Sequence, residues 1–195
     1  MFIELTDILR CPERHEEQFV VLIPDEMAGR SVRTGRLGCP VCHREYLIRD
    51  GVAEFGESAL SESSTRSRVT PEAIAAFLGL SGPGGYVGVV GGDTSLGRDL
   101  VQAIPGVHFV QVNPPPATTE LPMLSLLRAG SLPIKSRALR GVVLLSPFAE
   151  SSSWRSEAGR VLLPGLRIAG EGDPPADHGL EVLASAGGWW VAQRD

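Results

Sequence analysis

Four residues near the N-terminus have the types and spacing of a metal site. Cys39 and Cys42 form a CxxC motif, and Cys11 and His15 supply a second pair of ligand atoms upstream. Two such pairs, carried on two turns, can enclose a tetrahedral zinc ion. The spacing C-x3-H-x23-C-x2-C therefore predicts one zinc ion on these four residues, with His43 as the rival fourth ligand. The alternative is three buried thiols that act as small apolar groups.

Charge and cysteine usage restrict the compartment and the partners. The 195 residues include 18 basic and 23 acidic ones, and the formal net charge is −5 at pH 7. Nucleic-acid binding by bulk charge needs clustered positive residues, so we do not expect it here. The odd number of cysteines favours metal binding in a reducing compartment over a disulfide framework. The N-terminal residues lack the apolar run of an export signal or a membrane span, so we expect a cytoplasmic protein.

Short strands must position the four ligands. Residues 1–56 contain brief apolar runs at 19–23 and 45–48, separated by turn-rich stretches, which predicts a small β-rich domain. Residues 57–69 are rich in serine and have no periodicity, so they are predicted to be a linker, with proteolytic cleavage between Gly56 and Arg68. Residues 70–195 form the predicted second domain.

The second domain alternates strand and helix patterns. Thr70 and Pro71 provide an N-cap and a first-turn proline for a helix. Gly187 and Gly188 predict a hairpin turn near the end of the chain. Between them we expect strands at 86–90, 107–112 and 141–146 and helices at 96–104 and 120–129. This rhythm predicts an α/β fold with a mostly parallel, doubly wound sheet that an antiparallel C-terminal hairpin completes.

Both domains resemble known families. LTDILRCPERH and GCPVCHREYLIRDGVAEF resemble the small bacterial zinc-ribbon proteins related to the activator subunit of RNA and release-factor methyltransferases. Arg14 stands where that family has a second cysteine. YVGVVGGDTSLG, SLPIKSRALRGVVLLSPF and LLPGLRIAG, in this order, resemble class I S-adenosylmethionine-dependent methyltransferases. The resemblance implies a zinc ribbon followed by a Rossmann-like, methyltransferase-type domain.

The methyltransferase resemblance also implies where a cofactor would bind. Gly91 and Gly92 match the glycines of the first loop, through which the backbone approaches the cofactor. Asp93 stands in place of a glycine, and Asn113 in place of the acid that binds the ribose. An uncharged residue at that position makes a weaker hydrogen bond to the ribose. The resemblance therefore implies a degenerate site at these four residues, with S-adenosylmethionine bound weakly or not at all.

These observations lead to two hypotheses for function. The first is a non-catalytic binding or scaffold protein, a pseudoenzyme of methyltransferase-like fold that docks a protein partner as a subunit of a larger assembly. No catalytic residue is assigned. The alternative is an active S-adenosylmethionine-dependent methyltransferase with an atypical cofactor pocket. Cofactor binding discriminates between the two hypotheses.

Overall fold

The computed structural model describes residues 1–56, 69–176 and 179–194. Its strands are β1 (Val21–Ala28), β2 (Ser31–Gly38), β3 (Glu45–Arg49), β4 (Val52–Glu54), β5 (Tyr86–Val90), β6 (His108–Val112), β7 (Leu124–Arg128), β8 (Leu139–Leu144), β9 (Leu162–Glu171), β10 (Leu180–Ala186) and β11 (Trp189–Arg194). Its helices are α1 (Pro71–Leu78), α2 (Leu96–Ala103) and α3 (Ser152–Val161), with short 3-10 helices η1 (Ile3–Asp7) and η2 (Phe148–Glu150). Except for Val69, the predicted linker 57–69 lies outside the described residues.

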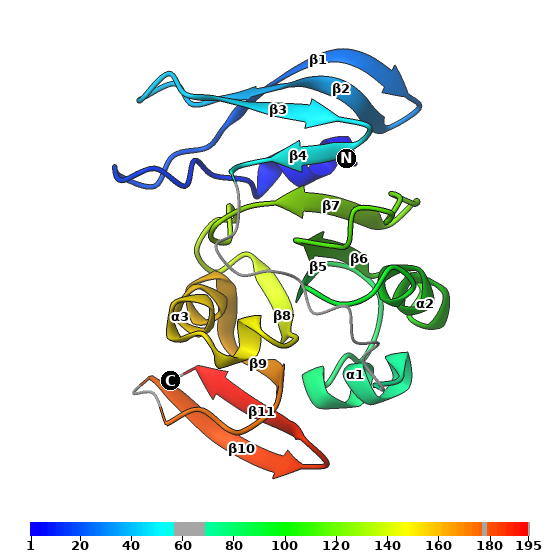
Figure 1. Cartoon of the computed structure of the whole chain (residues 1–195), viewed down its shortest axis with the longest axis vertical. Helices are drawn as coiled ribbons and strands as arrows, with labels where there is room; N and C mark the ends of the chain where they lie inside the picture. Colours follow the sequence, from blue (N-terminus) through cyan, green and yellow to red (C-terminus); the bar gives the residue numbers. More distant parts are fainter. Residues whose placement is uncertain (57–68, 177–178, 195) are drawn as a thin grey trace.

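Within the described residues, all these strands belong to one eleven-stranded sheet (Figure 1). Its order is β1-β2-β3-β4-β7-β6-β5-β8-β9-β11-β10. Strands β1 to β4 are antiparallel, and β4 then pairs with β7 in parallel, with Val52 opposite Leu126 and Glu54 opposite Arg128. The strands of the predicted zinc ribbon and those of the α/β segment are therefore hydrogen-bonded into a continuous sheet.

The prediction of a mostly parallel sheet holds only for the centre of this sheet. The pairs from β4 to β9 are parallel, and β11 and β10 follow as the predicted antiparallel hairpin. Because β1 to β4 add an antiparallel half, the sheet of the described residues as a whole is mixed. The central strands have the doubly wound order β7-β6-β5-β8-β9. Successive strands of the chain are added outward on both sides of the β5–β8 pair, which is therefore the point where the strand order reverses. Ligands of open α/β sheets bind beyond the strand ends at such a point.

The helix predicted at residues 120–129 is wrong, because this stretch contains β7. Leu126 packs into the apolar cluster under α1 and α2, whereas Leu127 packs into the cluster on the opposite face. A strand buried on both faces has an apolar run without alternation, and over five residues that run cannot be distinguished from a buried helix. Pairing with β4 and β6 decides the outcome.

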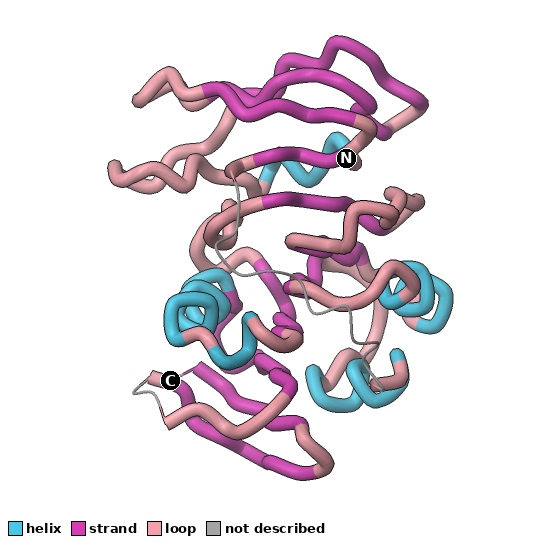
Figure 2. The backbone as a smooth tube through the Cα atoms, in the orientation of Figure 1, coloured by secondary structure: helices cyan, strands magenta, loops and turns pink. Residues whose placement is uncertain are grey.

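Two apolar cores lie on opposite faces of the sheet, with α1 and α2 on one face and α3 and η1 on the other (Figure 2). The core on the α3 side runs along the length of the molecule. It includes Leu5 of η1 and Leu37 of β2 together with Val110, Leu127 and Trp190. The segment that carries the predicted metal ligands thus shares its apolar core with the α/β segment.

Local signals at two turns act as the sequence predicts. The Thr70 hydroxyl accepts a hydrogen bond from the Ala73 backbone N–H at 3.3 Å, and α1 begins at Pro71. The helix ends at Gly79, whose φ of 65° suits glycine. Gly187 and Gly188 also have positive φ, which allows the tight turn between β10 and β11.

Candidate metal centre and cofactor crevice

Two turns bring the four predicted metal ligands together. Cys39 and Cys42 lie in the turn between β2 and β3, which is closed by hydrogen bonds from the Cys39 N–H to the Arg44 carbonyl (2.9 Å) and from the His43 N–H to the Cys39 carbonyl (3.0 Å). Cys11 follows η1, and its N–H donates to the Gln18 carbonyl at 2.9 Å. This bond closes the loop that carries His15.

Two of the six separations between the ligand atoms are close to the edges of a tetrahedral site. The four atoms lie within 4.8 Å of one another. The Sγ atoms of Cys11 and Cys42 are 3.7 Å apart, and Cys39 Sγ lies 3.4 Å from His15 Nε2. A tetrahedron with ordinary Zn–S and Zn–N bonds places two sulfurs about 3.8 Å apart and a sulfur and a nitrogen about 3.6 Å apart. The group can therefore hold a metal ion of this size.

The orientation of the His15 ring is fixed from outside the group. Its Nδ1 lies 2.7 Å from the Glu16 carbonyl oxygen and donates to it, which leaves the Nε2 lone pair directed at the thiols. Metal-binding histidines are typically oriented by such a bond. His43, the rival ligand, is exposed with a φ of 57° and does not belong to the group of ligand atoms.

The thiols differ in their electrostatic surroundings. Burial raises the pKa of Cys11 to about 11, even though the Tyr46 hydroxyl lies 3.1 Å from its sulfur. Burial also acts to raise the pKa of Cys39, but hydrogen bonds from the backbone N–H groups of Cys42 and Val41, with those from the neighbouring thiols, bring it down to about 7. The turn thus stabilises the Cys39 thiolate, the form that binds metal.

The predicted cofactor glycines lie at the switch point, where side chains of the same chain fill the space beside them. Gly91 and Gly92 follow β5 with φ of 80° and 90°. A Cβ added to Gly91 would lie 2.9 Å from the Phe148 ring, and one added to Gly92 would lie 2.7 Å from the Leu96 side chain. Phe148 is fully buried. Apolar side chains thus pack against both glycines on the side where a Cβ would stand.

The two polar residues of the predicted cofactor site are bonded to their own chain. Asp93 Oδ1 accepts hydrogen bonds from the Ser95 N–H and hydroxyl, both at 2.8 Å, and from the Leu96 N–H at 3.1 Å, at the start of α2. Asn113 is buried. Its Nδ2 donates to the Ala129 carbonyl and its Oδ1 accepts from the Ala129 N–H, both at 2.9 Å. Asn113 therefore fastens the end of β6 to the end of β7.

Gln111 is a residue of this crevice that the sequence analysis missed. Its side chain is fully buried, and its Nε2 donates to the Gly91 carbonyl at 3.0 Å, which supports the glycine loop from beneath. An amide within the apolar run VHFVQV was the signal that could have revealed it, because a buried polar side chain needs a partner.

Comparison with known proteins yields a similarity of structure and none of sequence. No protein-family model matches the chain, and no curated protein sequence matches it. Among solved structures, the crystal structure of the antibiotic-resistance methyltransferase Kmr is similar, with 14% sequence identity and a TM-score of 0.42. The similarity covers 69% of this chain and 98% of that one. None of the helices in the described part of the chain has the length and apolarity needed to cross a bilayer.

Proposed function

We propose that Cys11, His15, Cys39 and Cys42 bind one structural zinc ion. The observation that carries this proposal is the match between the 3.7 Å and 3.4 Å separations and the edges of a zinc tetrahedron. Four protein ligands leave no open position for a substrate, so the ion would hold the turns together and would not react. Elemental analysis of the purified protein should find about one zinc per chain. Absence of zinc from freshly purified, unchelated protein would contradict the proposal.

We infer that the α/β segment is a non-catalytic scaffold. The occupied crevice supports this inference, because Phe148 and Leu96 lie against the two glycines while Asp93 and Asn113 are bonded to backbone groups. A cofactor would have to displace a buried ring and break these bonds. The protein would then act through its surface, by docking a protein partner.

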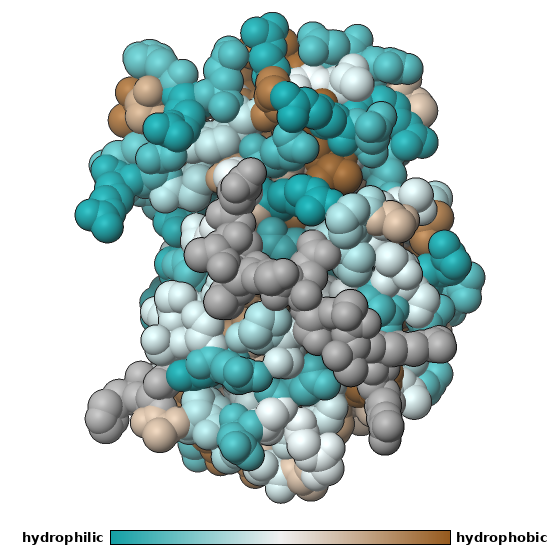
Figure 3. Space-filling model, in the orientation of Figure 1, coloured by the Kyte–Doolittle hydropathy of each residue, from teal (hydrophilic) through white to brown (hydrophobic). Residues whose placement is uncertain are grey.

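Exposed apolar side chains support a partner surface beside the metal centre. Of the nine large apolar residues that are exposed in the described part of the chain, six fall between residues 19 and 47: Phe19, Val21, Ile23, Met27, Val41 and Leu47. Ile23 and Leu47 flank Arg36 in register across β1, β2 and β3, so they lie on one face of the sheet. Figure 3 shows apolar patches among polar side chains at this end of the molecule. Such surface is typical of protein docking sites.

Calorimetric titration with S-adenosylmethionine and S-adenosylhomocysteine tests the scaffold proposal. We expect binding weaker than about 1 mM, the limit set by a binding free energy of about −4 kcal/mol. A dissociation constant below about 10 µM would favour the alternative, an active methyltransferase with an atypical pocket. The zinc-loaded protein is the sample to use, so that an unfolded N-terminal segment does not account for a negative result.

A further inference from the structure

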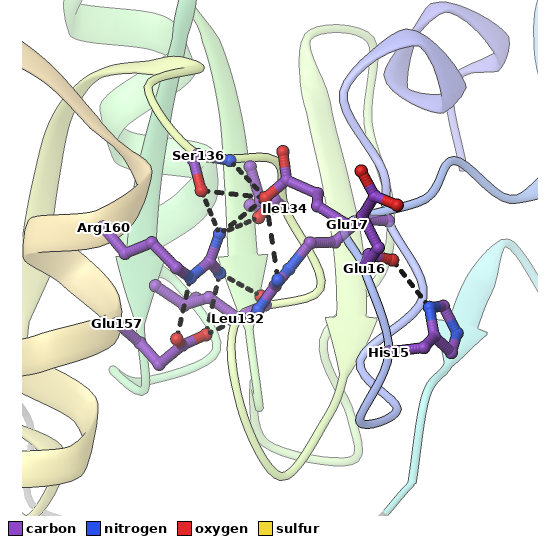
Figure 4. Close-up of polar contacts among 9 residues, drawn as sticks. His15, Glu16, Glu17, Leu132, Ile134, Ser136, Glu157 and Arg160 are labelled. Carbon is purple, nitrogen blue, oxygen red and sulfur yellow. Dashed lines mark hydrogen bonds and ion pairs between the residues drawn. The ribbon is translucent and has the colours of Figure 1, made fainter.

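The loop that carries His15 also contacts the α/β segment. Glu17 Oε2 accepts hydrogen bonds from the backbone N–H of Ser136 at 3.0 Å and from its hydroxyl at 2.8 Å. The same oxygen lies 3.6 Å from a guanidinium nitrogen of Arg160 (Figure 4). A guanidinium nitrogen of Arg10 is also 3.6 Å from it. Glu17 and Ser136 are 119 residues apart in the sequence. This carboxylate therefore joins the metal-binding loop to a distant part of the chain.

Arg160, which lies beside Glu17, is held in place by hydrogen bonds to other residues. The Arg160 guanidinium, from α3, makes two 2.8 Å hydrogen bonds to the Glu157 carboxylate. It also donates to the backbone carbonyls of Ile134 at 2.7 Å and Leu132 at 2.9 Å. These bonds fix residues 132–136 against α3, so Glu17 meets a preformed partner.

The loop thus has two anchors that lie close together in the chain. His15 belongs to the ligand group at one anchor, and Glu17, two residues later, reaches Ser136 at the other. Backbone bonds hold the flanks of the loop, with the Arg10 N–H donating to the Pro133 carbonyl and the Cys11 N–H to the Gln18 carbonyl. Between these flanks, ordering the loop at one anchor reduces the entropic cost of closing the other.

We propose that Glu17 is a positioning residue that couples metal binding to the docking of the N-terminal loop on residues 132–136 and α3. The proposal rests on the metal site proposed above. Coupling is reciprocal: if the Glu17 contact raises the affinity for zinc by some factor, zinc favours the contact by the same factor. A change at either anchor should therefore be measurable at the other.

Substitution of Glu17 tests the effect on the metal. Zinc affinity is measured by competition with a chromophoric chelator for the wild type, Glu17→Ala, Glu17→Gln and the matched control Glu16→Ala. Coupling between two sites typically changes affinity by about 5-fold or more, which is the loss expected for Glu17→Ala. Glu16→Ala should stay within about twofold of the wild type, since only the Glu16 backbone carbonyl contacts His15. Glu17→Gln retains an acceptor oxygen for Ser136 and should recover part of the affinity.

Amide exchange tests the reverse direction. The Ser136 N–H is bonded to Glu17, so its exchange should accelerate when zinc is removed from the wild type, whereas the Val142 amide within β8 serves as the reference. In Glu17→Ala, zinc should no longer affect Ser136. If the wild type binds no zinc, the proposed metal site is wrong. If zinc binds, then equal affinities for Glu17→Ala and Glu16→Ala, or Ser136 exchange indifferent to zinc, would overturn the coupling.

Discussion

Three of the four candidate metal ligands, His15, Cys39 and Cys11, each have a polar neighbour beside the ligand atom. The Glu16 carbonyl orients His15, backbone N–H groups of the turn surround Cys39, and the Tyr46 hydroxyl lies against Cys11. Such neighbours reduce the reorganisation needed when a metal binds. His15 belongs to this group of ligand atoms, whereas His43 is exposed and lies outside it.

Replacing the two histidines one at a time tests this assignment. His15→Ala should lower zinc affinity by at least about 10-fold, because it removes the nitrogen 3.4 Å from Cys39 Sγ. His43→Ala is the matched control and should leave the affinity nearly unchanged, since His43 is exposed and lies outside the ligand group. Both are measured by chelator competition. The reverse order would assign the fourth ligand to His43.

His108 should make stability depend on pH. Burial, followed by the nearby positive charge of the Met1 amino group, lowers the pKa of His108 from 6.5 to about 4. Its Nε2 lies 2.9 Å from the Ser125 hydroxyl in a buried site. Between pH 6.5 and about 4 the unfolded chain binds a proton that the folded chain does not. His108 therefore leaves the free energy of unfolding unchanged above pH 6.5. As the pH drops from 6.5 towards 4, the free energy of unfolding falls by about 3 kcal/mol in total.

Denaturant unfolding across this pH range, compared between the wild type and His108→Gln, isolates the contribution. Carboxyl groups also titrate there, but they do so in both proteins, so the difference between the two curves reports on His108. The variant should lose less stability between pH 6.5 and 4 than the wild type. Parallel curves would show that His108 takes up its proton equally in the folded and unfolded states.

At the scale of elements, the strand ends around the crevice are fastened to each other. Asn113 bonds β6 to the residue after β7, and Asp93 accepts hydrogen bonds from the Ser95 and Leu96 N–H groups at the start of α2. Gln111 holds the loop between β5 and α2 from below. Polar residues at the switch point thus serve the connections between elements, although Gln111 Oε1 is buried without a hydrogen-bond partner among the described residues.

Restoring the methyltransferase residues should therefore not restore a cofactor site. In the double variant Asn113→Asp, Asp93→Gly, the buried Ala129 carbonyl loses its donor and the Ser95 and Leu96 N–H groups lose their acceptor. We expect the free energy of unfolding to fall by about 2 kcal/mol or more, with no gain in S-adenosylmethionine affinity. Asp93→Asn, which retains the acceptor oxygen, is the control for stability. Measurable cofactor binding by the double variant would show that the crevice can open.

At the scale of the whole molecule, the end that carries the candidate metal ligands and the α/β end share a sheet and a core. The β4–β7 pairing and the core that includes Leu37 and Leu127 both cross between them. Elements that share a core usually unfold together. The predicted boundary at residues 57–69 stays a prediction, because that segment lies almost wholly outside the described residues.

Removal of zinc should consequently destabilise the entire molecule. We expect one calorimetric unfolding transition, and a chelator should lower its midpoint without splitting it, because a ligand that binds only the folded state stabilises every element that folds with it. If trypsin cuts between Gly56 and Arg68, the fragments should elute together from a sizing column under native conditions. Two separate transitions, only one of them sensitive to zinc, would show that the segments fold independently.

The sequence by itself was sufficient where the signal was local. The CxxC turn, the cap at Thr70, the glycine hairpin and the strand at Tyr86–Val90 each depend on residues a few positions apart, and the structure has all four. Spacing also grouped Cys11, His15, Cys39 and Cys42, which the structure brings together as a group that could hold a metal ion. These features follow from the conformational preferences of short segments, and residues within a few positions determine those preferences.

Tertiary structure alone decided the features that depend on distant partners. Residues 124–128 form a strand because β4 and β6 flank them, and Asn113 is a structural residue because Ala129 lies beside it. The mixed sheet and the contact of Glu17 with Ser136 likewise join residues far apart in the chain. A buried polar group requires a hydrogen-bond partner, but the sequence does not identify which distant residue provides it. Only the folded chain specifies these pairs.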